Sequence, residues 1–80
     1  MLQDWLIFKY RVMTVNINGD TTELPDGSGL TDILKLRNID PAHKGVAVAV
    51  NNRVVSREKW DSFTLNENDN ILIIKATQGG

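Results

Sequence analysis

Alternating apolar and polar positions mark the first strands of this chain. Residues 13–17 alternate with a period of two, the pattern of a half-buried strand. The two residues that follow, Asn18-Gly19, accept the positive φ that a short hairpin turn requires. Residues 21–24 are then predicted to return as a second strand, which the Pro-Asp-Gly cluster at 25–27 ends. The pattern predicts an amino-terminal β-hairpin.

One helix is predicted over about residues 30–37. Starting from Leu30, apolar side chains recur at i+3 and i+4, and the stem of Arg37 extends the same face at i+7. Ser28 or Gly29 can cap its amino end. A helix this short depends on packing rather than on intrinsic propensity, so its apolar face is expected to lie against a sheet.

The second half of the chain alternates between strands and turns. Residues 46–50 read as a third strand, and Asn51-Asn52 as a hairpin-type turn into a short strand at 54–55. Residues 56–60 are typical of a short helical turn that places Trp60 under the sheet. A last turn at 66–69 precedes the closing strand.

The closing strand, residues 71–74, is a continuous aliphatic run, which favours a central rather than an edge position. An amino-terminal hairpin beside a central carboxy-terminal strand indicates an α+β fold. The prediction is a ubiquitin-like β-grasp, a mixed sheet of four to five strands with one main helix packed across it. It occupies residues 13–80 and ends in a flexible tail at 75–80. Residues 1–12 form an extension, either a loose segment or a lead-in to the first strand.

Composition excludes several classes of function. A net charge of -1 gives no basic surface for nucleic acid or an anionic membrane, and the apolar run at residues 5–8 is too short to span a bilayer. The chain has no cysteine, so it has neither disulfides nor a thiolate nucleophile, which fits the cytoplasm. The single histidine, His43, falls in a predicted loop, and the acidic residues are scattered without metal-ligand spacing. Gly27-Ser28-Gly29 lacks the lysine of a phosphate-binding loop and is interpreted as a capping turn. The chain is therefore not expected to be an enzyme, nor to bind a metal or cofactor itself.

The informative chemistry lies at the carboxyl end, Gly79-Gly80. Two terminal glycines occur by chance in about one chain in two hundred at roughly 7% glycine usage. Without side chains, such an end can thread a narrow tunnel into another protein's active site. The carboxylate of Gly80 can be activated as a mixed anhydride with AMP, which a sulfur nucleophile then displaces to leave a thiocarboxylate. An unused tail is the competing interpretation.

The alternation also predicts an apolar patch. If Val46, Val48 and Val50 face the helix, then Ala47 and Ala49 face outward, and Leu72 and Ile74 do the same on the closing strand. Adjacent strands would place the four side chains together at the root of the tail, where they form a candidate docking surface. Coverage by residues 1–12, or ordinary surface, is the alternative.

Several stretches resemble the thiamine-biosynthesis sulfur carrier family, ThiS. They are residues 13–19, 30–34, 46–60, 68–71 and 79–80. The most specific is the Arg-Glu-x-Trp element formed by Arg57, Glu58 and Trp60, which is expected to hold its turn together rather than to react. Asn68 replaces the family's usual glycine, and asparagine tolerates the left-handed region.

The resemblance implies a sulfur carrier for thiazole formation. An E1-like adenylyltransferase, ThiF, would adenylate Gly80 with its own ATP and magnesium. A cysteine desulfurase or persulfide carrier would donate sulfur, and the thiocarboxylate would pass it to thiazole synthase, ThiG. Gly79 and Gly80 carry over directly, and Gln78 is expected to contact the partner.

Two alternatives remain open. The small subunit of molybdopterin synthase uses the same terminal chemistry, but its family typically approaches the glycines through a proline-rich segment, unlike residues 76–78 here. A ubiquitin-like modifier or passive interaction domain is the alternative from a different class.

Overall fold

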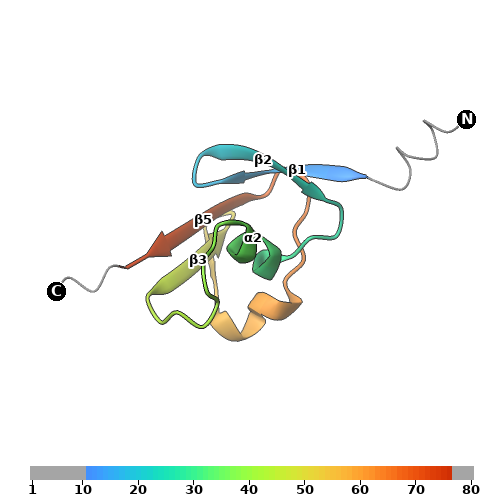
Figure 1. Ribbon diagram of the computed structural model, residues 1–80. Helices are drawn as coiled ribbons and strands as arrows, with labels where there is room; N and C mark the ends of the chain where they lie inside the picture. The colour runs from blue at the N-terminus through green and yellow to red at the C-terminus, as the bar shows by residue number, and fades with distance from the viewer. Residues whose placement is uncertain (1–10, 77–80) are drawn as a thin grey trace, which may run out of the picture.

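The protein, represented by a computed structural model that describes residues 11–76, folds as a five-stranded mixed sheet with helices on one face (Figure 1). The strand order is β2-β1-β5-β3-β4. The elements are β1 (Val12–Ile17), β2 (Asp20–Pro25), α2 (Leu30–Leu36), β3 (Val46–Val50), β4 (Arg53–Val55), the 3-10 helix η1 (Arg57–Ser62) and β5 (Asn70–Lys75). The predicted β-grasp arrangement is confirmed.

The amino-terminal hairpin forms as predicted. β1 and β2 pair antiparallel from Val12 opposite Pro25 to Ile17 opposite Asp20. Asn18 and Gly19 both adopt positive φ, at 51° and 88°. This geometry lets a two-residue turn follow the twist of its strands. β2 is one residue longer at each end than predicted, and it can include Pro25 because it lies at the sheet edge.

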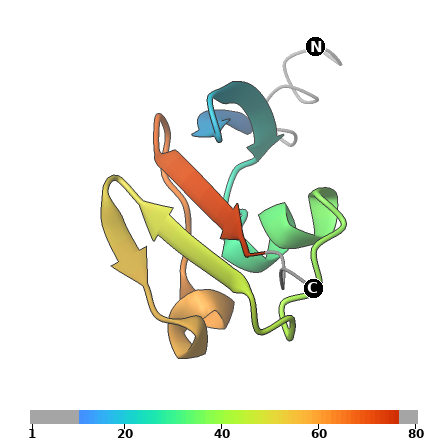
Figure 2. The same cartoon turned by 90° about the vertical axis from the view of Figure 1, so that its left-hand side faces the viewer.

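β5 is the central strand, also as predicted. It runs parallel to β1 and antiparallel to β3, and Figure 2 shows it lying alongside β3. Its backbone pairing with β1 is short, and the side chain of Asn18 extends it. Asn18 donates to the carbonyl of Ile73 at 3.1 Å and accepts from the amide of Ile73 at 2.7 Å. The β1–β5 pairing ends at Ile17 opposite Ile71, and beyond that point the side-chain amide of Asn18 takes the place of a backbone partner for Ile73.

The helices cover the inner face of the sheet. α2 buries Leu30, Ile33 and Leu34, the face predicted from their spacing. Gly29 is its N-cap, and the carboxylate of Asp32 accepts a hydrogen bond from the Gly29 amide at 2.9 Å. This confirms that the glycine-rich segment before α2 is a capping turn.

η1 places Trp60 in the core, as predicted. Its ring is 3% exposed, and the indole Nε1 donates to the carbonyl of Val55 at 2.9 Å. Strand and helix residues together form the buried apolar cluster. Its fully buried members are Val15, Ile17, Leu30, Ile33, Leu34, Val48 and Ile71. The turns after β3 and before β5 also use asparagine at positive φ, at Asn51, Asn52 and Asn68. Asn68 therefore adopts the left-handed conformation that was expected to suit this position.

Candidate functional site

The candidate site begins where β5 ends. Lys75 pairs with Val46, and the amide of the next residue, Ala76, donates to the carbonyl of Gly45 at 2.7 Å. Ala76 is exposed and is the last residue that the structure describes. The predicted site residues Gln78, Gly79 and Gly80 lie outside the described residues. The root of the tail is therefore the end of the central strand.

An exposed apolar surface adjoins that root, on the sheet face opposite α2. Ala47 lies opposite Ile74, and Ala49 lies opposite Leu72. Leu72 and Ile74 are 49% and 53% exposed, whereas Val48 on the inner face is 1% exposed. The four side chains predicted to share the outer face therefore do so; we call them the apolar patch.

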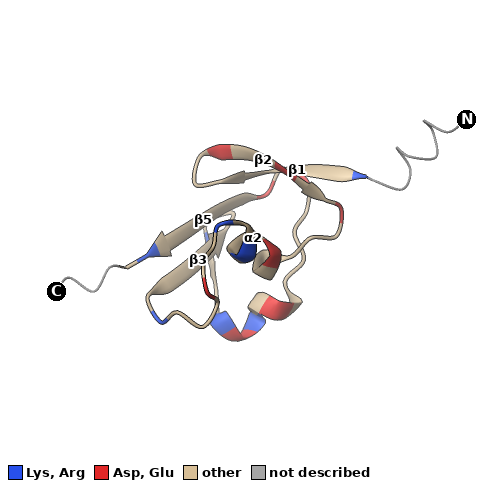
Figure 3. Ribbon diagram, in the orientation of Figure 1, with Lys and Arg blue, Asp and Glu red and all other residues tan. Residues whose placement is uncertain are grey.

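The patch extends further than the sequence analysis predicted. Val54 of β4 lies opposite Ala49 and is 81% exposed, which continues the patch to the sheet edge. The available signal was that Val54 and Val55 are consecutive in the predicted short strand, so they must face opposite sides of the sheet. Figure 3 shows β3 without charge and β5 charged only at its end, at Lys75. The patch can therefore lose water without burying a charge.

A hollow lies at the other end of the outer face, away from the tail. It measures about 870 Å³ and has Leu72 and Ala49 in its lining together with four asparagines. These are Asn16, Asn18, Asn52 and Asn70. Asn16 Oδ1 accepts from the Gly19 amide at 2.9 Å, so part of this polar rim serves the hairpin turn. The hollow could not be predicted from local patterns, because its lining comes from four separate segments of the chain.

Residues 11–76 contain no candidate metal centre. Within that range no three histidine, cysteine or acidic side chains converge on a possible metal position. His43 is exposed in its loop, as predicted, and its Nδ1 accepts a hydrogen bond from the Gly45 amide at 3.1 Å. The described part of the chain also contains no helix long and apolar enough to cross a membrane.

All three residues of the Arg-Glu-x-Trp element were predicted to hold their turn together, and the structure shows such contacts for Arg57 and Trp60. The Arg57 guanidinium lies 4.5 Å from the centroid of the Trp60 ring and donates to the carbonyls of Pro41, His43 and Val46. Glu58 is exposed on the first turn of η1. The element therefore connects η1 to the loop before β3.

These features define a class: a small β-grasp domain whose central strand leads into the carboxy-terminal segment beside a bare apolar sheet face. The comparisons then identify the family. The ThiS family model matches residues 15–80, and the chain belongs to the ThiS family.

Individual relatives agree with this assignment. The sulfur carrier protein ThiS of Escherichia coli (strain K12) is 26% identical over 68 residues, which cover 85% of this chain and 100% of that protein. A crystal structure of the thiamine biosynthesis protein ThiS from Geobacter metallireducens has a TM-score of 0.69 at 24% identity, covering 85% of this chain and 100% of that one. A solution structure of a thiamine biosynthesis protein from the same organism also gives a TM-score of 0.69, at 26% identity, with 85% and 88% covered.

Proposed function

We propose that this protein carries sulfur for thiamine biosynthesis on the terminal carboxylate of Gly80. Membership of the ThiS family carries the proposal. Support comes from the position of β5, which joins the carboxy-terminal segment directly to the middle of the sheet. The protein then acts as a substrate of other enzymes and performs no catalysis itself.

The chemistry follows from what a carboxylate can and cannot do. A carboxylate is a poor electrophile, so an oxygen of Gly80 first attacks the α-phosphorus of ATP, which releases pyrophosphate and forms an acyl-adenylate. A persulfide sulfur displaces AMP and forms an acyl disulfide with the donor protein. A second thiol, from the donor or a small-molecule reductant, then attacks the donor's sulfur, forms a disulfide with it and releases the thiocarboxylate of Gly80. The activating enzyme binds the ATP and magnesium and positions the reactants. Gly79 and Gly80 have no side chains, so the tail is narrow enough to enter that active site.

The apolar patch is the surface on which we propose that partners dock. Leu72 and Ile74 are each about half exposed and stand next to the small Ala49 and Ala47. A carrier must be released after each transfer, which suits a modest apolar contact rather than a permanent interface. The partners we propose are an E1-like adenylyltransferase of the ThiF type, which also contacts Gln78, a thiazole synthase of the ThiG type, and a cysteine desulfurase or persulfide carrier in the cytoplasm.

Mass spectrometry of the intact protein tests this proposal. Incubation with ATP, magnesium, the adenylyltransferase and a sulfur donor should add about 16 Da as one oxygen is replaced by sulfur. The matched control lacks the donor and should show the adenylate without the sulfur gain. A protein that never gains this mass with its cognate enzymes is not a sulfur carrier. Rescue of a molybdenum-cofactor mutant but not of a thiamine auxotroph would assign it to the other pathway.

A further inference from the structure

The loop before β3 contacts the root of the tail more closely than a side chain would allow. The Ala76 amide donates to the Gly45 carbonyl at 2.7 Å. A Cβ placed on Gly45 would lie only 2.7 Å from the Ala76 carbonyl oxygen and 3.3 Å from the His43 ring. Real Cβ atoms essentially never approach backbone so closely. Glycine at this position therefore lets Ala76 lie against the loop, one residue beyond the end of β5.

Arg57 fixes the same loop from its other side. Its guanidinium donates to the carbonyls of His43 at 2.7 Å and Val46 at 3.2 Å, which flank Gly45, and to that of Pro41. Charge-assisted bonds from one planar group fix both distance and orientation. Contact with the buried Trp60 ring at 4.5 Å in turn holds the guanidinium.

The end of β4 explains why an arginine is needed there. β4 pairs with β3 only from Val48 to Val50. The carbonyl of Val46 therefore lies past the last strand neighbour on that side, and Arg57 supplies its donor. Without that guanidinium, the segment that carries Gly45 would lose its attachment to η1, and its hydrogen bond to Ala76 would be weakened.

We propose that Arg57 is a positioning residue for the C-terminal tail. By fixing the carbonyls of His43 and Val46, it holds Gly45 in place and so keeps Ala76 bonded to the body of the protein. Ala76 is then the fixed departure point from which residues 77–80 continue. This inference rests on the proposed function, because a set departure point matters only if another enzyme must reach Gly80.

The position of Ala76 limits how far Gly80 can reach into a partner's active site. Four residues, 77–80, follow Ala76, and four residues span at most about 14 Å when fully extended. Loss of the Gly45–Ala76 bond would add one residue to that reach, a change of about 3.5 Å. Misplacement of reacting groups by about 1 Å can lower a rate about a hundredfold. A shift of the departure point is therefore large on the scale that catalysis tolerates.

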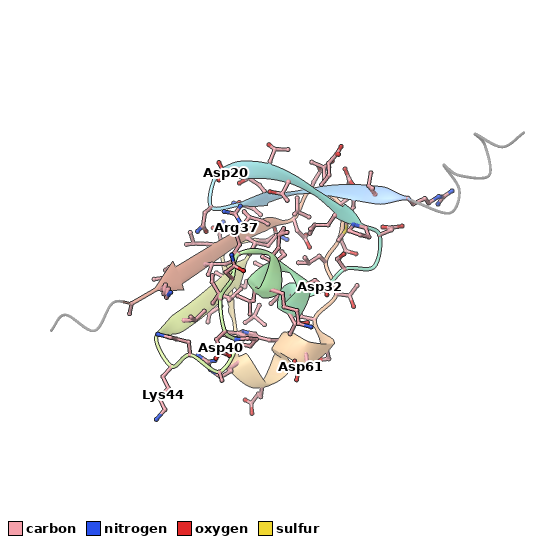
Figure 4. The ribbon with its side chains drawn as sticks, in the orientation of Figure 1. Asp20, Asp32, Arg37, Asp40, Lys44 and Asp61 are labelled. Atoms are coloured by element: carbon pink, nitrogen blue, oxygen red, sulfur yellow. The ribbon has the colours of Figure 1, made fainter. Side chains whose placement is uncertain are left out.

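Amide hydrogen exchange on the isolated protein tests the positioning directly. Arg57→Ala should accelerate exchange of the Ala76 amide about fivefold to tenfold, the loss expected for one weakened hydrogen bond, while the Ile73 amide stays as in the wild type. Gly45→Ala should accelerate Ala76 in the same way with Arg57 intact. Lys44→Ala is the matched control, since Lys44 belongs to the same loop and its side chain points away from the body (Figure 4). Unchanged exchange at Ala76 in both Arg57→Ala and Gly45→Ala would overturn the proposal.

Adenylation kinetics separate positioning from stability. A mispositioned tail on an intact patch should lower kcat about tenfold or more with KM nearly unchanged. A variant that is merely partly unfolded should raise the apparent KM and keep kcat at saturation. Arg57→Lys, which keeps the charge but not the planar fork, should recover part of kcat. If the wild type is adenylated and both Arg57→Ala and Gly45→Ala keep its kcat, the inference alone is refuted. If the wild type is never adenylated, the proposed function is refuted, and the exchange result still decides the positioning.

Discussion

The two faces of β3 and β5 have the same kinds of side chain and opposite surroundings. On the inner face, Val48 and Ile73 are 1% and 8% exposed beneath α2 and η1. On the outer face, Leu72 and Ile74 are about half exposed. An aliphatic side chain left in water gives up the free energy that burial would provide, about 1.5–3 kcal/mol each. The difference teaches that the inner face stabilises the fold, whereas the outer face leaves aliphatic surface available for the partner docking that we propose.

The largest expected effect comes from Gly80, which lies beyond the end of β5 in the sequence and bears the carboxylate on which the proposed chemistry takes place. Deletion of Gly80 should abolish adenylation completely, since the carboxylate that remains would stand one residue too short. The melting temperature should stay at the wild-type value, because the buried cluster lies among the described residues well before it. Adenylate detection by mass spectrometry and a thermal melt measure the two quantities. Unfolding of the deletion variant would show that the tail supports the body.

Two adjacent residues of β5 test the contrast between the faces directly. Ile73→Glu should unfold the protein, since it places an unpaired charge in the core. Leu72→Glu should leave the melting temperature within a few degrees and weaken partner binding about tenfold or more. Circular dichroism melts and titration with the adenylyltransferase give both numbers. A large drop in stability for Leu72→Glu would mean that this side chain is covered in solution.

Trp60→Ala tests how much the inner face contributes. Trp60 is 3% exposed and its Nε1 is bonded to Val55, so truncation should cost about 3–5 kcal/mol. Denaturant unfolding measures the loss, and Val54→Ala on the outer face serves as its control. A cost below about 1 kcal/mol would contradict the placement of Trp60 in the core.

The smallest expected effect concerns the side chain that extends the pairing of β5. Asn18→Gly keeps a residue suited to positive φ but removes both bonds to Ile73. It should cost about 1–3 kcal/mol, since it leaves two partly buried backbone groups without a partner. Asn52→Gly is the matched control at a φ of 69° and should change stability by only a few tenths of a kcal/mol. Equal free energies of unfolding for the two variants would show that the hydrogen bonds between the Asn18 side chain and Ile73 contribute nothing to stability.

Local patterns in the sequence were sufficient for most of the fold. The Asn18-Gly19 turn and the spacing of Leu30, Ile33 and Leu34 depend on neighbouring residues, so they could be predicted. The apolar patch could be predicted as well, because strand alternation decides which face a side chain takes. That Val54 belongs to this surface was missed, since β4 is only three residues long.

Contacts between segments distant in sequence could not be predicted. The bonds of Asn18 to Ile73 join residues 55 positions apart, and those of Arg57 to the loop before β3 join residues up to 16 apart. Each depends on a side-chain conformation that tertiary packing selects. The predicted role of Gln78, Gly79 and Gly80 and the predicted domain boundary at residue 13 remain predictions.

Placing the tail on a strand with neighbours on both sides has a mechanical effect. A partner that grips the end and pulls along β5 loads the ladders to β1 and β3 together, along with the two bonds of Asn18. Bonds loaded in parallel share the force and must break nearly at once, whereas an edge strand could peel away one bond at a time. Under the proposed function, the domain is therefore expected to resist force applied while a partner threads and releases the tail, and its lifetime under that force is set by the rate of unfolding rather than by its equilibrium stability.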